Sequence, residues 1–187
     1  MLRTILANVF LIFFLLTEVI LRRKGEAKSL QTDKSDKGST AAILVVYLFS
    51  IGLLIGISLV DYGFFRNDVI GLIGLILMPM GLVLRFWSMK VLGGYYSRTL
   101  RIVQNQSVVT TGPYRVVRHP GYLSSICLWV GAGLSFENFV LIGLYGLIFI
   151  TVYVYRIIAE EKMLVRELGD EYSQYQKRSW KLFPLIY

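Results

Sequence analysis

The sequence predicts an all-α integral membrane protein with five transmembrane helices. Hydrophobic residues make up 55% of the 187 residues, and the mean hydropathy is +0.59, so the chain is more apolar than most soluble domains. Most of its charges lie between apolar stretches, which are long enough to be read as helices in lipid. The five apolar stretches are residues 2–21, 41–60, 69–86, 122–136 and 139–158.

Charge and composition bound the classes of partner. The net charge is +8, but the lysines and arginines lie in the connections and do not form one basic helix face. That distribution is typical of cytoplasmic loops, so we expect the lipid bilayer and no nucleic acid as partner. A single cysteine, Cys127, excludes an internal disulfide, and with a single histidine, His119, we expect no metal site.

The first two apolar stretches are predicted full-length spans. Arg22-Arg23-Lys24 follows the first stretch like a stop-transfer flank, and Glu18 near its end is expected to reach the membrane interface. Residues 22–40 are interpreted as a polar linker and not as a site. In the second stretch, we expect Gly52-x-x-x-Gly56 to pack against another helix of this chain, with a dimer face as the alternative.

The third stretch contains Pro79, which predicts a kink. Residues 92–118 are basic and are not a span, although a short hairpin between 100–103 and 108–111 fits their pattern. The fourth stretch, 122–136, is shorter than a bilayer crossing, which needs about 20 residues.

The fourth and fifth stretches are expected to form a tight hairpin about Glu137-Asn138. After them, residues 159–187 predict an amphipathic helix that ends near Gly169, followed by a further helical turn and an aromatic tail.

Counts of lysine and arginine predict the orientation. Six follow the first stretch and five lie from Lys90 to Arg118, whereas only Arg66 follows the second stretch and none follows the fourth. Positive residues are retained in the cytoplasm, so we expect the N-terminus outside and the C-terminus inside. The expected location is a prokaryotic plasma membrane.

The sequence Arg118-His119-Pro120-Gly121-Tyr122 stands where the basic segment meets the fourth apolar stretch. Pro120 suits the first turn of a helix, which places His119 at the N-cap, where an anion is favoured. Farther along the chain, Arg156 precedes Glu160-Glu161 by one helical turn, so Arg156 and Glu160 share a helix face.

These motifs resemble, in order and spacing, the isoprenylcysteine carboxyl methyltransferases and the related phospholipid N-methyltransferases, which are small membrane enzymes that use S-adenosylmethionine. The resemblance covers about residues 92–184, and it divides the chain into N-terminal helices, 1–91, and a catalytic region, 92–187. The shared motifs are Leu92-Gly93, Gly112-Pro113-Tyr114, Arg118-His119-Pro120-x-Tyr122, Arg156-x-x-x-Glu160-Glu161 and Leu182-Phe183-Pro184.

The resemblance implies a set of residues that contact S-adenosylmethionine. These residues are Gln106, Ser107, Val108, Val109, Tyr114, His119, Pro120, Gly121, Tyr122 and Glu160. Their chemistry suits the cofactor, because a helix N-terminus with His119 as donor attracts a carboxylate. Glu160 and the faces of Tyr114 and Tyr122 attract an ammonium or sulfonium group.

The resemblance also implies that Arg156 holds the carboxylate of a prenylcysteine-like acceptor. A carboxylate is already ionised and needs no base, whereas an amine acceptor such as an ethanolamine phospholipid must first lose a proton. Glu161 is the candidate for that base, or else it supports its neighbours. The residues leave carboxylate and amine chemistry open.

Two other classes of function stay open. A sterol-type reductase that uses NADPH has a similar C-terminal helix, and residues 98–118 are basic enough to bind a 2′-phosphate. A membrane protein without activity would use its basic loops to bind lipid headgroups. A Rossmann cofactor site is not supported, because Gly131-Ala132-Gly133 lies in an apolar helix and continues to Phe136.

Overall fold

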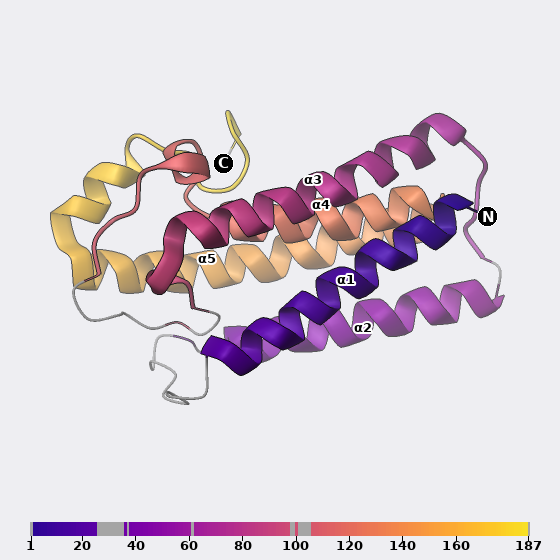
Figure 1. The fold of residues 1–187 in the computed structure, drawn as a ribbon, viewed down its shortest axis with the longest axis horizontal. Helices are drawn as coiled ribbons and strands as arrows, with labels where there is room; N and C mark the ends of the chain where they lie inside the picture. The colour runs from indigo at the N-terminus through magenta and orange to yellow at the C-terminus, as the bar shows by residue number, and fades with distance from the viewer. Residues whose placement is uncertain are drawn as a thin grey trace.

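The computed structural model describes residues 2–25, 36, 38–60, 62–97, 100 and 106–186, which form an elongated helical bundle (Figure 1). Among these residues there are helices and two isolated bridges but no strand. The helices are α1 (Leu2–Gly25), α2 (Ser39–Val60), α3 (Asp68–Leu92), α4 (Pro120–Ser135) and α5 (Phe139–Gln176), with short 3₁₀ turns η2 (Gly93–Tyr95) and η3 (Gly112–Arg115).

Three of the helices are long and apolar enough to cross a membrane. They are α2, α3 continued through η2, and α5. α4 has 16 residues, or about 24 Å, which is less than the hydrocarbon core of about 30 Å. α5 has 38 residues, or about 57 Å, so its C-terminal part extends well beyond a bilayer.

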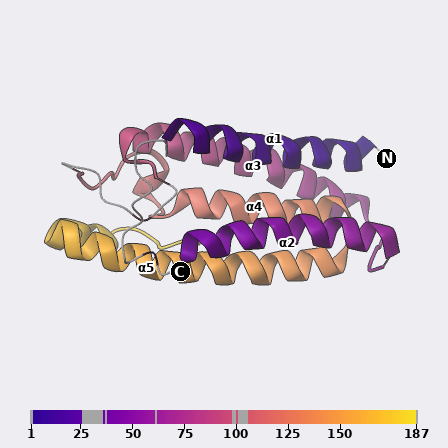
Figure 2. The ribbon, with the colours of Figure 1, turned by 90° about the horizontal axis from the view of Figure 1, so that it is seen from below.

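The bundle has two chemically different ends. At one end lie the N-terminus, the connection between α2 and α3 and that between α4 and α5, held together by Arg3, which pairs with Asp68 (3.2 Å) and Glu137 (2.5 Å). The other end gathers the start of α2, the end of α3, the start of α4, η3 and the distal part of α5 (Figures 1 and 2). The motifs singled out in the sequence therefore meet at one end.

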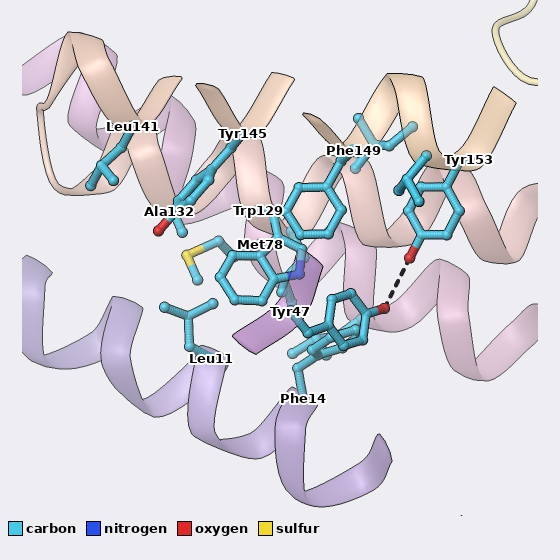
Figure 3. Packing of buried hydrophobic residues seen from close by; sticks show 14 of the residues in the cluster. Leu11, Phe14, Tyr47, Met78, Trp129, Ala132, Leu141, Tyr145, Phe149 and Tyr153 are labelled. Carbon is cyan, nitrogen blue, oxygen red and sulfur yellow. Dashed lines mark hydrogen bonds between the residues drawn. The ribbon is translucent and has the colours of Figure 1, made fainter. Parts of the chain in front are cut away.

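An aromatic cluster joins α1, α2, α4 and α5 (Figure 3). Trp129 stacks on Phe149 with ring centroids 5.1 Å apart, and Tyr47 packs against both rings. The Tyr47 and Tyr153 hydroxyls are 2.9 Å apart and hydrogen-bonded. Aromatic pairs of this kind add to the stabilisation from burial, and the cluster fixes α5 against the other helices.

α3 and α4 approach closely because their contact is lined by small residues. A Cβ atom on Gly74 would lie 2.5 Å from the backbone nitrogen of Ser135 and 2.6 Å from the carbonyl oxygen of Gly131. One on Gly81 would lie 2.7 Å from the carbonyl oxygen of Ser124. Small residues allow such backbone contact between membrane helices.

Several local predictions are met. His119 is the N-cap of α4 with Pro120 in the first turn, and Gly169 interrupts α5 with φ 58° and ψ −130°. Pro79 lies inside α3, and the kink expected at this proline stays a prediction. The tight connection about Glu137-Asn138 is present, with Glu137 at φ 51°.

Other local predictions differ. No atom lies within 4 Å of a Cβ added to Gly52 or Gly56, so their expected packing within the chain is wrong and this face of α2 points outward. The expected hairpin falls partly on 101–105, outside the described residues, and 106–110 has no regular secondary structure.

The close contact between α3 and α4 predicts opposite outcomes for two glycines. Gly74→Ala should lower the free energy of unfolding by about 1–3 kcal/mol, because its methyl group has no room against α4. Gly52→Ala should leave stability unchanged or slightly raise it, because open space surrounds it and alanine favours helix. Unfolding in detergent, followed by tryptophan fluorescence, measures both, and equal stabilities would contradict the close contact.

Candidate active site

The start of α4 is held from the side by α3. His119 has non-helical backbone angles and ends the preceding loop, and Pro120 begins the helix. The guanidinium of Arg85 on α3 donates to the carbonyl oxygen of Gly121 (3.0 Å). The motif Arg118-His119-Pro120-Gly121-Tyr122 is therefore fixed at the level where α3 ends.

His119 lies between two carboxylates of α5. Its Nε2 atom is 3.2 Å from Glu161 Oε1, and its Nδ1 atom is 3.8 Å from Glu160 Oε2. The ring stacks on Tyr122, with centroids 5.6 Å apart and planes at 11°. In the structure, the two ring nitrogens of His119 thus lie near carboxylates of the protein itself, whereas the sequence predicts His119 as a donor to a bound carboxylate.

Tyr122 connects the predicted cofactor and acceptor residues. Its hydroxyl donates to Glu160 Oε2 (2.5 Å) and accepts from Arg156 Nε (3.2 Å). Arg156 and Glu160, which share a helix face, are therefore bridged by a tyrosine of another helix. The Glu160 side chain is 25% exposed, which makes it the more accessible of the two neighbouring glutamates.

Arg156 is buried at 1% exposure and contacts the start of α2. Its Nη1 atom donates to the Asp36 carboxylate, to Ser39 Oγ (2.7 Å) and to Thr40 Oγ1 (2.9 Å). Asp36, which lies in the segment 22–40 interpreted as a linker, thus contacts the predicted acceptor residue. Sequence reasoning missed this residue because nothing in a polar segment marks which carboxylate meets a cation 120 residues away.

The charge on Asp36 is stabilised by its surroundings. Burial opposes ionisation, but hydrogen bonds from Thr40 and Ser39 and the positive charge of Arg156 outweigh it, so the pKa of the Asp36 carboxyl is lowered. Asp36 is therefore a carboxylate at neutral pH, and the pair with Arg156 is ionic.

Glu161 ties the motif to the C-terminal part of the chain. Its Oε1 atom accepts from Arg118 Nε (2.7 Å), and its Oε2 atom accepts from Gln176 Nε2 (3.2 Å). Together with the His119 contact, these bonds stabilise its charged form. A carboxylate so engaged is a poor proton acceptor, so the geometry favours support of His119 over the base that the sequence left open.

Arg118 also binds the end of α5 and the segment that follows it. Its Nη1 atom donates to the carbonyl oxygens of Gln176 (3.0 Å) and Ser179. Its backbone N–H donates to Trp180 O (2.8 Å), and the Trp180 N–H donates back to Val116 O (2.9 Å). The chain after α5 therefore closes over the motif.

The remaining predicted cofactor residues lie around this centre. Tyr114 in η3 is buried, and burial and then the negative charge of Glu160 raise its pKa, which places it within the field of Glu160. The stretch 106–109 runs along the distal part of α5, where the Val108 N–H donates to Glu171 (3.3 Å). Val108 also packs on a small cluster, Leu100, Met163, Leu164, Tyr172 and Tyr175.

Arg85 and Glu18 were not predicted as site residues. Arg85 donates to Glu18 Oε1 (2.6 Å) and to the Tyr96 hydroxyl (3.0 Å) besides Gly121. A signal existed, because an acidic and a basic residue near the ends of two apolar stretches are expected to pair inside a membrane. The expected place of Glu18 at the membrane interface stays a prediction, and the structure adds Arg85 as its partner.

Comparison with known proteins identifies related sequences. The sequence model of the isoprenylcysteine carboxyl methyltransferase family matches residues 72–166. A protein-S-isoprenylcysteine O-methyltransferase of Schizosaccharomyces pombe is 34% identical over 109 residues, which cover 57% of this chain and 46% of that protein. A nickel-cobalt-cadmium resistance protein, NccN, of Alcaligenes xylosoxydans xylosoxydans is 31% identical over 114 residues, covering 61% and 49%. This chain thus spans about half the length of these relatives.

A solved structure has a similar fold. It is the structure of the eukaryotic intramembrane Ras methyltransferase ICMT, with a TM-score of 0.67 and 22% identity. The match covers 95% of this chain and 64% of that one. The likeness extends over the N-terminal helices, for which the sequence motifs gave no guidance.

The Arg118–Glu161 pair predicts a large loss of stability when either partner is removed. Arg118→Ala and Glu161→Gln should each lower the free energy of unfolding by about 3–5 kcal/mol, because the other partner remains buried without its charge partner. Arg166→Ala is the matched control, since Arg166 pairs with Glu167 at 2.6 Å but is 57% exposed. That surface pair should contribute under about 1 kcal/mol. Equal losses in the free energy of unfolding for Arg118→Ala and Arg166→Ala, measured in detergent, would contradict the stabilising role of the Arg118–Glu161 pair.

Proposed function

The chain belongs to the isoprenylcysteine carboxyl methyltransferase family, and we propose that it is a membrane-embedded methyltransferase that uses S-adenosylmethionine to methylate the carboxylate of a prenylcysteine-like acceptor. The observation that carries the proposal is the line Glu160–Tyr122–Arg156, with hydrogen bonds of 2.5 and 3.2 Å. A carboxylate and a guanidinium are thereby held on either side of one hydroxyl, as a cationic cofactor and an anionic acceptor require.

The residues on the Glu160 side fit S-adenosylmethionine. Glu160 is a partly exposed carboxylate, and the ring of Tyr122 stacks with His119 beside it. A carboxylate next to aromatic faces attracts ammonium and sulfonium groups. When bound there, the cofactor supplies an electrophilic methyl group on a positively charged sulfur.

The proposed acceptor side is Arg156. A planar guanidinium pairs well with a carboxylate, and its position at the end of the apolar run 139–158 suits a lipid-borne group. Methyl transfer to a carboxylate oxygen would break the sulfur–carbon bond of the bound cofactor and would leave the bonding electrons on sulfur. No proton moves, so the residues only align and desolvate the acceptor.

The proposed topology follows from the two ends of the bundle. We infer that all five helices are transmembrane, with the short α4 beginning below the headgroups at His119, the N-terminus outside and the site end in the cytoplasm of a prokaryotic plasma membrane. The lysine and arginine counts support this orientation, and of the basic residues that the structure describes, Lys90 at the end of α3, Arg115 in η3 and Arg118 lie at the site end. Residues 92–187 would then form the catalytic region on a scaffold of residues 1–91.

Two substitutions should separate cofactor binding from transfer. Glu160→Gln and His119→Ala should weaken S-adenosylhomocysteine binding at least tenfold, because a charge and its aromatic neighbour are lost. Arg156→Lys should leave that affinity within about twofold yet lower methyl transfer to a small prenylcysteine acid, since truncating a buried charge pair costs about 2–5 kcal/mol. Calorimetry and a transfer assay in detergent measure the two quantities.

Glu167→Gln provides the control on the same helix, because the Glu167 side chain is 39% exposed and faces Arg166. It should change neither quantity. Wild-type S-adenosylhomocysteine affinity in both Glu160→Gln and His119→Ala would sink the cofactor assignment. Wild-type transfer by Arg156→Lys would sink the acceptor assignment.

Cysteine labelling tests the orientation. In a Cys127→Ser background, a cysteine at the exposed Asp68 should react with an impermeant maleimide in intact cells. A cysteine at Ser107, which is exposed at the site end, should react only after permeabilisation. The reverse order of reactivity would overturn the proposed sidedness.

A further inference from the structure

Asp36 lies at the proposed acceptor side without belonging to any motif of the catalytic region. Its Oδ1 atom accepts from Ser39 Oγ (2.9 Å), Thr40 Oγ1 (2.8 Å) and Arg156 Nη1. Its Oδ2 atom accepts from the Thr40 backbone N–H (3.4 Å). The side chain is 8% exposed, so a carboxylate from before α2 is buried against the guanidinium of α5.

This contact has the chemistry that is assigned to the acceptor. Arg156 is the residue proposed to hold an acceptor carboxylate, and the group bonded to it here is itself a carboxylate. Tyr122 and Glu160 continue the chain of hydrogen bonds on the far side of Arg156. Asp36 therefore binds the same guanidinium as the expected acceptor carboxylate. It contacts Nη1 of Arg156, whereas Tyr122 on the cofactor side contacts Nε.

We propose that Asp36 is an acceptor-specificity residue, whose carboxylate pairs with Arg156 in the resting protein and is replaced there by the acceptor carboxylate. The inference rests on the proposed function, because it takes Arg156 as the acceptor residue. It adds that the site selects for anionic acceptors through an internal competitor.

Arg156 is paired with a carboxylate before and after the exchange. Asp36 lowers the cost of burying the Arg156 charge while no acceptor is bound, and the acceptor carboxylate does the same after the exchange. Asp36 then keeps its bonds from Ser39 and Thr40 at the start of α2, and these bonds offset part of the cost of separating its carboxylate from the guanidinium.

Selectivity follows from the same competition. A neutral or cationic lipid offers nothing to replace the Asp36 carboxylate, so Arg156 stays paired and such a lipid gains no contact there. An acid does replace it, but Asp36 competes for Arg156. The apparent affinity for the acid is therefore the intrinsic affinity multiplied by the fraction of protein in which Asp36 has left Arg156. Specificity is thereby obtained at the expense of affinity.

Asp36→Asn is the direct test, because asparagine keeps the shape and the acceptor oxygen for Ser39 and Thr40 but removes the charge. With S-adenosylhomocysteine bound, the Kd for an N-acetylated S-prenylcysteine should fall about tenfold in calorimetry. Its methyl ester, which carries no anion, should bind as in the wild type. In the transfer assay KM should fall similarly, with kcat within about twofold.

A merely structural role for Asp36 gives the opposite result. In that case Asp36→Asn would weaken the acid and the ester alike, and this outcome, or an unchanged Kd for the acid, overturns the proposal. Asp68→Asn is the matched control at the other end of the bundle, since it also removes a carboxylate that pairs with an arginine. It should alter neither ligand's affinity.

Two further variants keep the test decisive. If Asp36→Asn does not fold, Ser39→Ala removes one bond to the Asp36 carboxylate and one to Arg156 Nη1. Both losses weaken the resting pair, so the Kd for the acid should fall about two- to fivefold; an unchanged or raised Kd overturns the proposal. Arg156→Lys separates the two levels of inference. If Arg156→Lys binds the acid like the wild type, the proposed function fails. If Arg156→Lys loses the acid but Asp36→Asn gains nothing, only the role of Asp36 fails.

Discussion

The need to pair charges that are withdrawn from water determines how the site end of this bundle is assembled. Three arginines, Arg85, Arg118 and Arg156, have side chains less than 10% exposed, and each contacts a carboxylate. The carboxylates come from three different places, namely α1, α5 and the segment before α2. Because an unpaired buried charge costs several kcal/mol, each pair also fixes where a distant segment of the chain must lie.

These ion pairs are connected to the aromatic core through His119 and Tyr122 of the motif at the start of α4. His119 stacks on Tyr122, and Tyr122 stacks on Tyr153 with centroids 4.9 Å apart. Tyr153 continues to Phe149 and so to Trp129 in the middle of the bundle. The polar site is thus built on a file of packed rings, and rings held on both faces keep few alternative rotamers. The geometry around Arg156 and Glu160 is set in advance by this packing.

Hydrophobicity, turn chemistry and motif order were enough to predict the helices, the start of α4 at Pro120, the break at Gly169 and the grouping of the motifs. These features depend on local sequence, so their physical causes are visible in it. The partners of the buried arginines were not predictable in the same way. Asp36 meets Arg156 across 120 residues, and neither residue carries a periodic signal that selects the other. The packing predicted for Gly52 and Gly56 was wrong for a related reason, because small residues permit close packing but do not specify a neighbour.

The closure of the segment after α5 has a consequence for how the protein is made. The carbonyl groups that Arg118 contacts belong to Gln176, the last residue of α5, and to Ser179 beyond it, so both are translated after the apolar parts of all five helices. Helices can enter the membrane while synthesis continues, but Arg118 and Glu161 acquire their full set of partners only when this last segment folds back. The site end would therefore mature as a late step of biogenesis, and a nascent chain released before Gln176 would present an inserted bundle with an incompletely neutralised site.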